Sequence, residues 1–255
     1  MKHIMGVHRH GSETVLIMHK DKNNLMLTEI IKTATTQTGI TSIVAELRGL
    51  AWYNARNKIK VICKREIESQ NFYMIKILPN KDFYHVDTNV PYRQLAKHLD
   101  AMINHYIHIW IDYKDNEYAP VHGDLSLVGN VLFNAKGDVV FIDWEHFNDV
   151  VKVPTGFDPV MIIFENLFFE IDRCNILSSD VLNHVVGSLL KLKEAKLLSK
   201  VFMSNPIQST LDIINSNLAI WNGQYYKLPI LKLTKKFIVN TDIAITRKLN
   251  FLENI

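Results

Sequence analysis

Residues 121–130 read VHGDLSLVGN, and residues 140–145 read VFIDWE. The first stretch contains a carboxylate, Asp124, and an amide, Asn130, and the second places the carboxylate Asp143 directly after an apolar run. Transfer of a γ-phosphoryl group needs a carboxylate beside the attacking hydroxyl and oxygen ligands for Mg²⁺. The two stretches therefore contain the side chains that this chemistry requires.

A hairpin is predicted between the two stretches. Apolar residues at Val131–Phe133 and Val139–Ile142 flank a polar turn at Asn134–Gly137. We expect this hairpin to bring Asn130 and Asp143 to the same side.

The His-Gly-Asp motif at 122–124 and the Ile-Asp-Trp-Glu motif at 142–145 resemble those of the aminoglycoside phosphotransferase and choline kinase family. In that family the two motifs stand where protein kinases have His-Arg-Asp and Asp-Phe-Gly. The resemblance covers roughly residues 4–170 and implies a protein-kinase-like fold that uses ATP and Mg²⁺.

The resemblance also implies roles for individual residues. Asp124 would be the catalytic base that orients the acceptor hydroxyl, and Asn130 and Asp143 would bind Mg²⁺. His122 would be structural and brace the loop. Asp158 precedes an expected helix, and we interpret it as a helix cap or a brace of the loop.

The loop departs from the kinase pattern in one respect. The kinase asparagine follows the catalytic aspartate by five positions, whereas Asn130 follows Asp124 by six. Gly129 has no Cβ, so it can accommodate the additional residue as a bulge. Ser126 is the alternative oxygen ligand for the metal ion.

The expected fold class is α+β, with the bilobal arrangement of protein kinases. Residues 1–80 would form a nucleotide-binding lobe with a small antiparallel sheet and one helix, and residues 81–255 a larger, mainly helical catalytic and substrate-binding lobe. The hydrophobic pattern predicts these elements: a first strand ending at 4–6, a loop at 7–12, strands at 13–19, 25–34, 61–67 and 72–78, and helices at 43–56, 92–110 and, with a break at Pro206, 160–217. The N-cap of the helix at 43–56 is expected at Thr41 or Ser42.

A kinase-like first lobe also needs a lysine on its third strand and a glutamate on the following helix. Lys32 and Glu46 occupy these positions in the predicted order. An ion pair between them would hold Lys32 against the α- and β-phosphates of ATP. Lys20 is the alternative for the lysine.

Two further nucleotide contacts are expected. Ser12 and the backbone amides near Gly11 would cap the phosphates of ATP, although the loop lacks the full Gly-x-Gly-x-x-Gly pattern. By resemblance alone, backbone groups around Ile77 would bind the adenine edge.

The sequence says less about the small-molecule hydroxyl acceptor. The candidate contacts are aromatic, acidic or imidazole side chains beyond the loop: Trp144, Glu145, His146, Glu165, Glu170 and Trp221. No acidic cleft for a cationic amine is evident. A neutral hydroxyl compound, such as a sugar or a glycan end, is therefore favoured over an aminoglycoside or a choline-like amine.

Composition excludes several other classes. No apolar run approaches the roughly 20 residues of a membrane span, and no basic run alternates with aromatic residues as in a nucleic-acid-binding surface. With two cysteines, Cys63 and Cys174, the chain has neither a disulfide framework nor a cysteine-based zinc site, which fits a cytoplasmic protein.

Two other functions compete with small-molecule phosphorylation. A pseudokinase would bind nucleotide or a partner without catalysis, consistent with the shifted Asn130 and the sparse glycines of the first loop. A protein kinase is disfavoured because residues 151–157 are too few for a peptide-docking activation segment.

Overall fold

The computed structural model describes residues 2–9, 14–21, 27–69, 72–78, 82–86, 90, 92–127, 129–174, 178–216 and 234–253. It contains small antiparallel sheets together with helices, which confirms the α+β class. The chain divides into two compact units. The first unit contains Met1–Tyr84 and Leu132–Asn148, and the second contains His85–Val131 and Asp149–Ile255.

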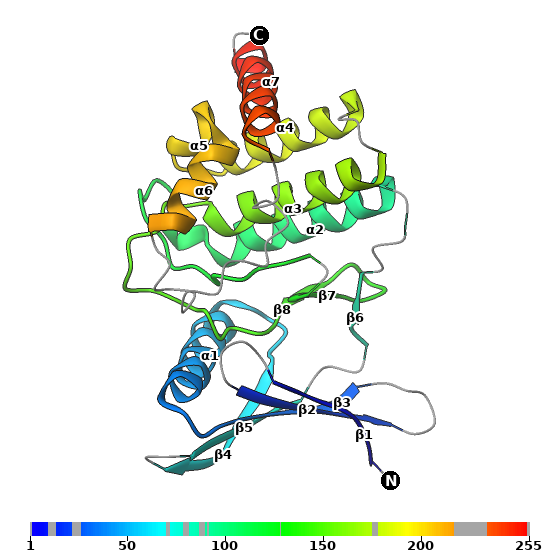
Figure 1. Cartoon of the computed structure of the whole chain (residues 1–255), viewed down its shortest axis with the longest axis vertical. Coiled ribbons are helices and arrows are strands. Elements are labelled where there is room, and N and C mark those ends of the chain that lie inside the picture. Colours follow the sequence, from blue (N-terminus) through cyan, green and yellow to red (C-terminus); the bar gives the residue numbers. More distant parts are fainter. Residues whose placement is uncertain are drawn as a thin grey trace. The chain divides into compact units, whose positions relative to one another are not determined.

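The first unit is built on a five-stranded antiparallel sheet and one helix (Figure 1). The strand order is β1-β2-β3-β5-β4. The elements are β1 (Lys2–Arg9), β2 (Thr14–Asp21), β3 (Leu27–Ala34), α1 (Gln37–Arg56), β4 (Ile62–Ser69) and β5 (Phe72–Leu78). The predicted order of three strands, a helix and two strands is confirmed.

Strand β3 lies inside this sheet, between β2 and β5. Lys32 is paired with Leu16 of β2 and with Ile75 of β5. Ile75 is fully buried, and Ile77 is nearly so. Because neighbours on both sides hold β3 in register, the backbone of Lys32 is fixed within the sheet.

The predicted loop at residues 7–12 is wrong for its first part. Strand β1 continues through Arg9, and the ladder with β2 runs on from Gly6 after a register shift between Ile4 and Gly6. A glycine inside a strand often marks such a bulge and does not end the strand.

Helix α1 begins earlier than predicted. Its N-cap is Thr36, whose Oγ1 accepts a hydrogen bond of 3.2 Å from the Gly39 N–H. Thr41 and Ser42 therefore lie within the helix. Burial of Ile40 and Ile43 stabilises a first turn whose intrinsic helix propensity is low.

A second, three-stranded sheet has the order β6-β7-β8, formed by β6 (Tyr84–His85), β7 (Val131–Phe133) and β8 (Val139–Phe141). The predicted hairpin is thus confirmed, with both of its strands buried. Asn134 Oδ1 accepts two backbone N–H groups of the turn, and Gly137 has a φ of +84°, which glycine adopts without strain.

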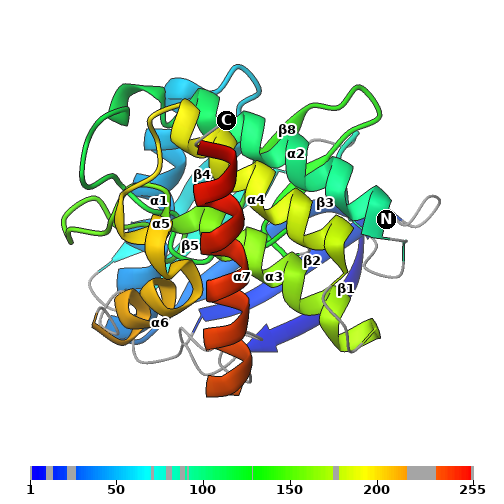
Figure 2. The same ribbon diagram turned by 90° about the horizontal axis from the view of Figure 1, so that it is seen from above.

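The second unit is mainly helical. Its elements are α2 (Tyr92–Ile109), η1 (Ile111–Tyr113), α3 (Phe157–Cys174), α4 (Ser179–Glu194), α5 (Val201–Ser204), α6 (Pro206–Ser216) and α7 (Lys235–Glu253). Figure 2 shows α2, α3 and α4 side by side, and α7 packs against α4, α5 and α6. The expected break at Pro206 is the first residue of α6.

Helix α3 supplies much of the apolar core of this unit. Val160, Ile162 and Ile163 are fully buried, and Phe164 is 2% exposed. Of the helices that the structure describes, none is both long and apolar enough to cross a membrane.

Candidate functional site

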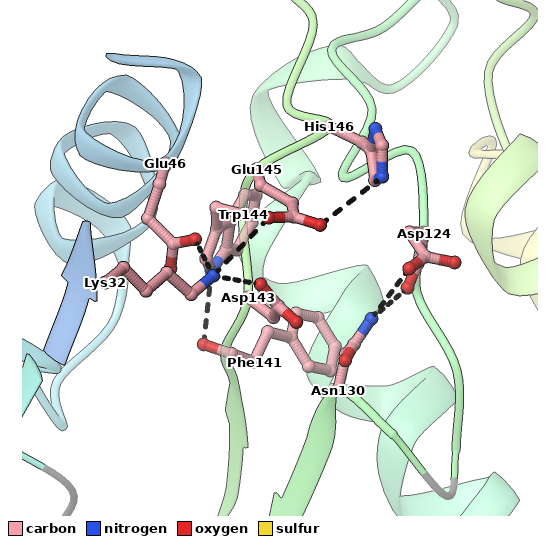
Figure 3. A network of polar contacts seen from close by, with 9 residues as sticks. All are labelled: Lys32, Glu46, Asp124, Asn130, Phe141, Asp143, Trp144, Glu145 and His146. Atoms are coloured by element: carbon pink, nitrogen blue, oxygen red, sulfur yellow. Dashed lines mark hydrogen bonds and ion pairs between the residues drawn. The ribbon is translucent and has the colours of Figure 1, made fainter. Parts of the chain in front are cut away.

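Lys32 is the centre of a buried polar network in the first unit (Figure 3). Its ammonium donates a hydrogen bond of 2.5 Å to Glu46 Oε2 and a second one to Asp143 Oδ1, and it lies 3.8 Å from Glu145 Oε2. Lys32 is 4% exposed, and Glu46 is fully buried. The predicted pairing of Lys32 with Glu46 is therefore present, and Asp143 and Glu145 join it.

This network has more negative than positive charge. When all are ionised, three carboxylates face one ammonium, an excess of two negative charges. Burial alone would lower the pKa of Lys32, but Asp143, Glu46 and Glu145 together raise it well above its usual value. Burial raises the pKa of Glu46 to about 7, because the attraction of Lys32 only partly offsets burial and the two neighbouring carboxylates.

The same residues fit a divalent cation. One oxygen each from Glu46, Asp143 and Glu145 lie within 4.8 Å of one another. Glu46 Oε1 is buried without a hydrogen-bond partner. Carboxylate oxygens are the ligands that Mg²⁺ prefers, and the excess of two charges equals the charge of the ion. The Asp143 side chain, at 22% exposed, is the most accessible of the three.

Helix α1 fixes the backbone on both sides of Asp143. Asp143 has a φ of 64°, in the left-handed region that aspartate enters more readily than most residues. Before it, the Phe141 N–H donates a hydrogen bond of 3.1 Å to Tyr53 Oη. After it, the fully buried Trp144 ring lies 5.1 Å from the Tyr53 ring. Packing against Tyr53 thus holds Asp143 in a conformation that costs free energy by itself.

A close approach at Gly49 completes this contact. Glu46, Gly49 and Tyr53 follow one another at helical spacing, so they share one face of α1. A Cβ added at Gly49 would lie 2.6 Å from Trp144 Cβ and 2.8 Å from Phe147 Cβ. The helix can therefore reach the segment that contains Asp143 only because residue 49 has no side chain.

Gly49→Ala is expected to destabilise the protein by about 1–3 kcal/mol, because the added methyl group overpacks a rigid contact. Urea unfolding followed by circular dichroism measures the change. Gly187→Ala is the matched control, since Gly187 lies in α4 with open space around its Cβ position. That variant is expected to gain roughly 0.5–1 kcal/mol from helix propensity. Equal effects at both positions would contradict the close-packing argument.

In the second unit, Asp124 is exposed between the buried residues Gly123 and Leu125. Asn130 Nδ2 donates a hydrogen bond to the Asp124 carbonyl and lies 3.4 Å from Asp124 Oδ2 (Figure 3). The asparagine thus orients Asp124, and its Oδ1 is the atom that a metal ion would use. Asn130 and Asp143 belong to different units. The expectation that these two residues bind the same Mg²⁺ ion therefore stays a prediction.

Asp158 braces the same loop. Its fully buried carboxylate accepts hydrogen bonds from the His122 N–H at 2.8 Å and from the Gly123 N–H at 3.0 Å. Burial raises the pKa of Asp158 to about 7, and the charge of Asp124 adds to this effect, while the two hydrogen bonds oppose it. The interpretation of Asp158 as a loop brace is confirmed, and His122 is fully buried, as a structural role requires.

A second carboxylate of α3, Glu165, holds the other side of the loop. Its Oε1 accepts a hydrogen bond of 2.6 Å from the Ser126 hydroxyl, and its Oε2 accepts one of 3.0 Å from the Leu127 N–H. Burial raises the pKa of Glu165 to about 7 despite these hydrogen bonds. A small pocket opens here, lined by Gly123, Asp124, Leu125, Ser126, Phe157, Asp158, Met161 and Glu165.

The structure brings Lys32 and Glu46 together, but among the residues that it describes it gives no such support for the other predicted nucleotide contacts. Ile77 lies inside β5 and is paired with Ile30 on one side and Cys63 on the other, so its backbone faces neighbouring strands. Ser12 lies outside the described residues, as does the side chain of Lys20.

The structure gives other roles to several of the acceptor candidates. Trp144 is a core residue and Glu145 is a contact of Lys32, so neither is placed as an acceptor wall. The His146 side chain is 12% exposed and lies 3.7 Å from Glu145. Trp221 and the side chain of Glu170 lie outside the described residues.

No family model matches the chain, and no curated protein matches it either.

Proposed function

We propose that the chain is an ATP- and magnesium-dependent phosphotransferase with a protein-kinase-like fold, which transfers the γ-phosphoryl group to a hydroxyl of a small molecule. The observation that carries the proposal is the buried contact of Lys32 with Glu46 and Asp143. Lys32 lies on a sheet strand, Glu46 on the following helix, and Asp143 two residues after a hairpin, which is the order that the resemblance implies.

Lys32 and its partners would receive the nucleotide. The ammonium is held rigidly, so it can bind phosphate oxygens without a further loss of side-chain entropy. When bound, Mg²⁺ would be held by Asp143 and Asn130 and would neutralise charge on the phosphates. Within the first unit, the unpaired oxygen of Glu46 lies in a cluster with carboxylate oxygens of Asp143 and Glu145, which would also attract a cation.

Asp124 would act on the acceptor. Its carboxylate is exposed on a loop whose neighbouring backbone groups are hydrogen-bonded to Asp158 and Glu165. A carboxylate fixed in this way can accept the hydrogen bond of an incoming hydroxyl and take its proton as the new oxygen–phosphorus bond forms and the bond from the γ-phosphorus to the departing ADP oxygen breaks.

We favour a neutral acceptor such as a sugar over a cationic amine, because the carboxylates beside Asp124 already have hydrogen-bond donors. The pocket contains the carboxylates of Asp158 and Glu165, but both oxygens of each accept hydrogen bonds from the loop. These two groups are therefore engaged in holding the loop.

The test is a phosphorylation assay with the purified chain, ATP and Mg²⁺ against panels of sugars, aminoglycosides and small amino alcohols. We expect ADP and a phosphorylated product with one acceptor class, at turnover numbers of about 1–100 s⁻¹, and no turnover after the metal is removed with EDTA. Nucleotide binding without turnover on any panel would assign the chain to the pseudokinases. Either that result or the absence of both binding and turnover would overturn the proposed transfer reaction.

A further inference from the structure

The loop that contains Asp124 has one residue more than the kinase pattern between its aspartate and its asparagine. Each additional residue that must be ordered costs about 1–2 kcal/mol of backbone entropy. A longer loop can therefore keep Asp124 in place only if other contacts restrain it. The structure contains such contacts at Ser126 and Leu127, which follow Asp124 in the chain.

Glu165 makes these contacts from helix α3. It lies seven residues after Asp158 on α3, which is about two turns, so both carboxylates project from one face of the helix. Asp158 holds the two residues before Asp124. Glu165 holds Ser126 and Leu127, which follow Asp124.

A continuous set of hydrogen bonds leads from Glu165 to Asp124. The carbonyl of Ser126, whose hydroxyl is bound by Glu165, accepts a hydrogen bond of 2.9 Å from the Asn130 N–H. Asn130 in turn donates its side-chain amide to the Asp124 carbonyl. Displacement of Ser126 would therefore also displace Asn130 and the backbone of Asp124.

We infer that Glu165 is a positioning residue for phosphoryl transfer, which clamps the lengthened loop so that Asp124 and Asn130 keep their reactive arrangement. This inference rests on the proposed function. Both carboxylate oxygens are engaged with the loop, so Glu165 contributes through Asp124 and does not touch the reacting atoms.

The test compares Glu165→Ala, Glu165→Gln and Asp242→Ala in the full chain. Asp242 is the matched control, since it is a buried carboxylate of the same unit that also accepts two backbone N–H groups, those of Ile207 and Gln208, at 2.9 and 3.0 Å. Loss of the Glu165 or the Asp242 carboxylate should lower stability. The two hydrogen bonds of Asp242 lead to α6, however, and not to the loop that contains Asp124. Thermal unfolding confirms that each variant is folded at the assay temperature.

Glu165→Ala is expected to lower kcat by about 10²-fold, the effect of a displacement of about 1 Å at a reactive group, while the KM for ATP stays unchanged. Glu165→Gln should restore most of kcat, because its Oε1 can accept from Leu127 and its Nε2 can donate to Ser126. Asp242→Ala should keep the wild-type kcat. Hydrogen exchange read by mass spectrometry should be about tenfold faster in the segment with Leu127 and Asn130 in Glu165→Ala, and unchanged there in Asp242→Ala.

Three results would overturn the inference. The first is an active wild type with an equally active Glu165→Ala, and the second is loop exchange that Glu165→Ala leaves unchanged. A third would be equal losses of kcat in Glu165→Ala and Asp242→Ala, which indicate general destabilisation. A wild-type chain that shows no turnover overturns the proposed function itself, and the exchange data still report whether Glu165 clamps the loop.

Discussion

Asp124→Asn is expected to lower kcat by about 10²–10⁴-fold, the range for loss of a positioned general base. Asparagine has the shape of aspartate, and its side-chain oxygen can still accept the contact from Asn130 Nδ2. The amide cannot take a proton from the acceptor hydroxyl. Turnover should therefore fall while the loop stays intact, and steady-state kinetics with the acceptor found in the screen measures the loss.

The free energy of unfolding and the affinity for nucleotide are the internal controls for the Asp124→Asn variant. Asp124 is exposed, so the substitution should change the free energy of unfolding by no more than about 0.5 kcal/mol. Asp212→Asn removes the same charge from an exposed position on α6 of the same unit and should leave kcat unchanged. An Asp124→Asn variant with wild-type kcat would show that Asp124 is not the base.

The Lys32–Glu46 pair could be predicted because it depends on element order alone. Three strands followed by a helix place a lysine on an inner strand and a glutamate on the packed face of the helix, and both elements have clear hydrophobic patterns. The contribution of Glu145 could not be predicted, because residues 113 positions apart meet only after the segment at 132–148 joins the first unit. The sequence around Glu145 fits a solvent-exposed acidic residue equally well.

The roles of Gly49 and Tyr53 were missed for a related reason. Neither residue has a distinctive sequence context, and each acts through its distance to residues 141–147. Glu165 did give a signal. It lies two helical turns after Asp158, and the interpretation of Asp158 as a loop brace would have suggested the same for a carboxylate on that face. Taken alone, the acidic side chain of Glu165 fits a contact with the acceptor equally well, as do those of several other residues.

The largest effect on stability is expected from Lys32→Met. Methionine preserves most of the aliphatic volume of lysine but leaves Glu46, Asp143 and Glu145 without their shared cation. Removing one partner from a buried ion pair typically costs about 3–5 kcal/mol. We expect a loss of this size at pH 8 in urea unfolding, together with loss of turnover.

The loss should depend on pH in a defined direction. Burial already raises the pKa of Glu46 to about 7 in the wild type, and loss of the attraction of Lys32 would hold that pKa still further above its value in the unfolded chain. A raised folded pKa means that the native state binds more protons than the unfolded state, so stability falls as pH rises through that range. The difference between wild type and Lys32→Met should therefore be smaller at pH 5 than at pH 8.

Two further variants separate this explanation from a general effect of losing a lysine. Lys196→Met removes a lysine from an exposed ion pair with Asp115, which is worth at most about 1 kcal/mol. Glu46→Gln removes one of the three negative charges near Lys32, so it should cost much less than Lys32→Met at pH 8, even though both disrupt the same ion pair. Equal and pH-independent losses in Lys32→Met and Glu46→Gln would show that the pair contributes through its geometry and that the excess negative charge has no role. The predicted difference between them follows only if three carboxylates share one ammonium, the condition that also makes this network suited to a divalent cation.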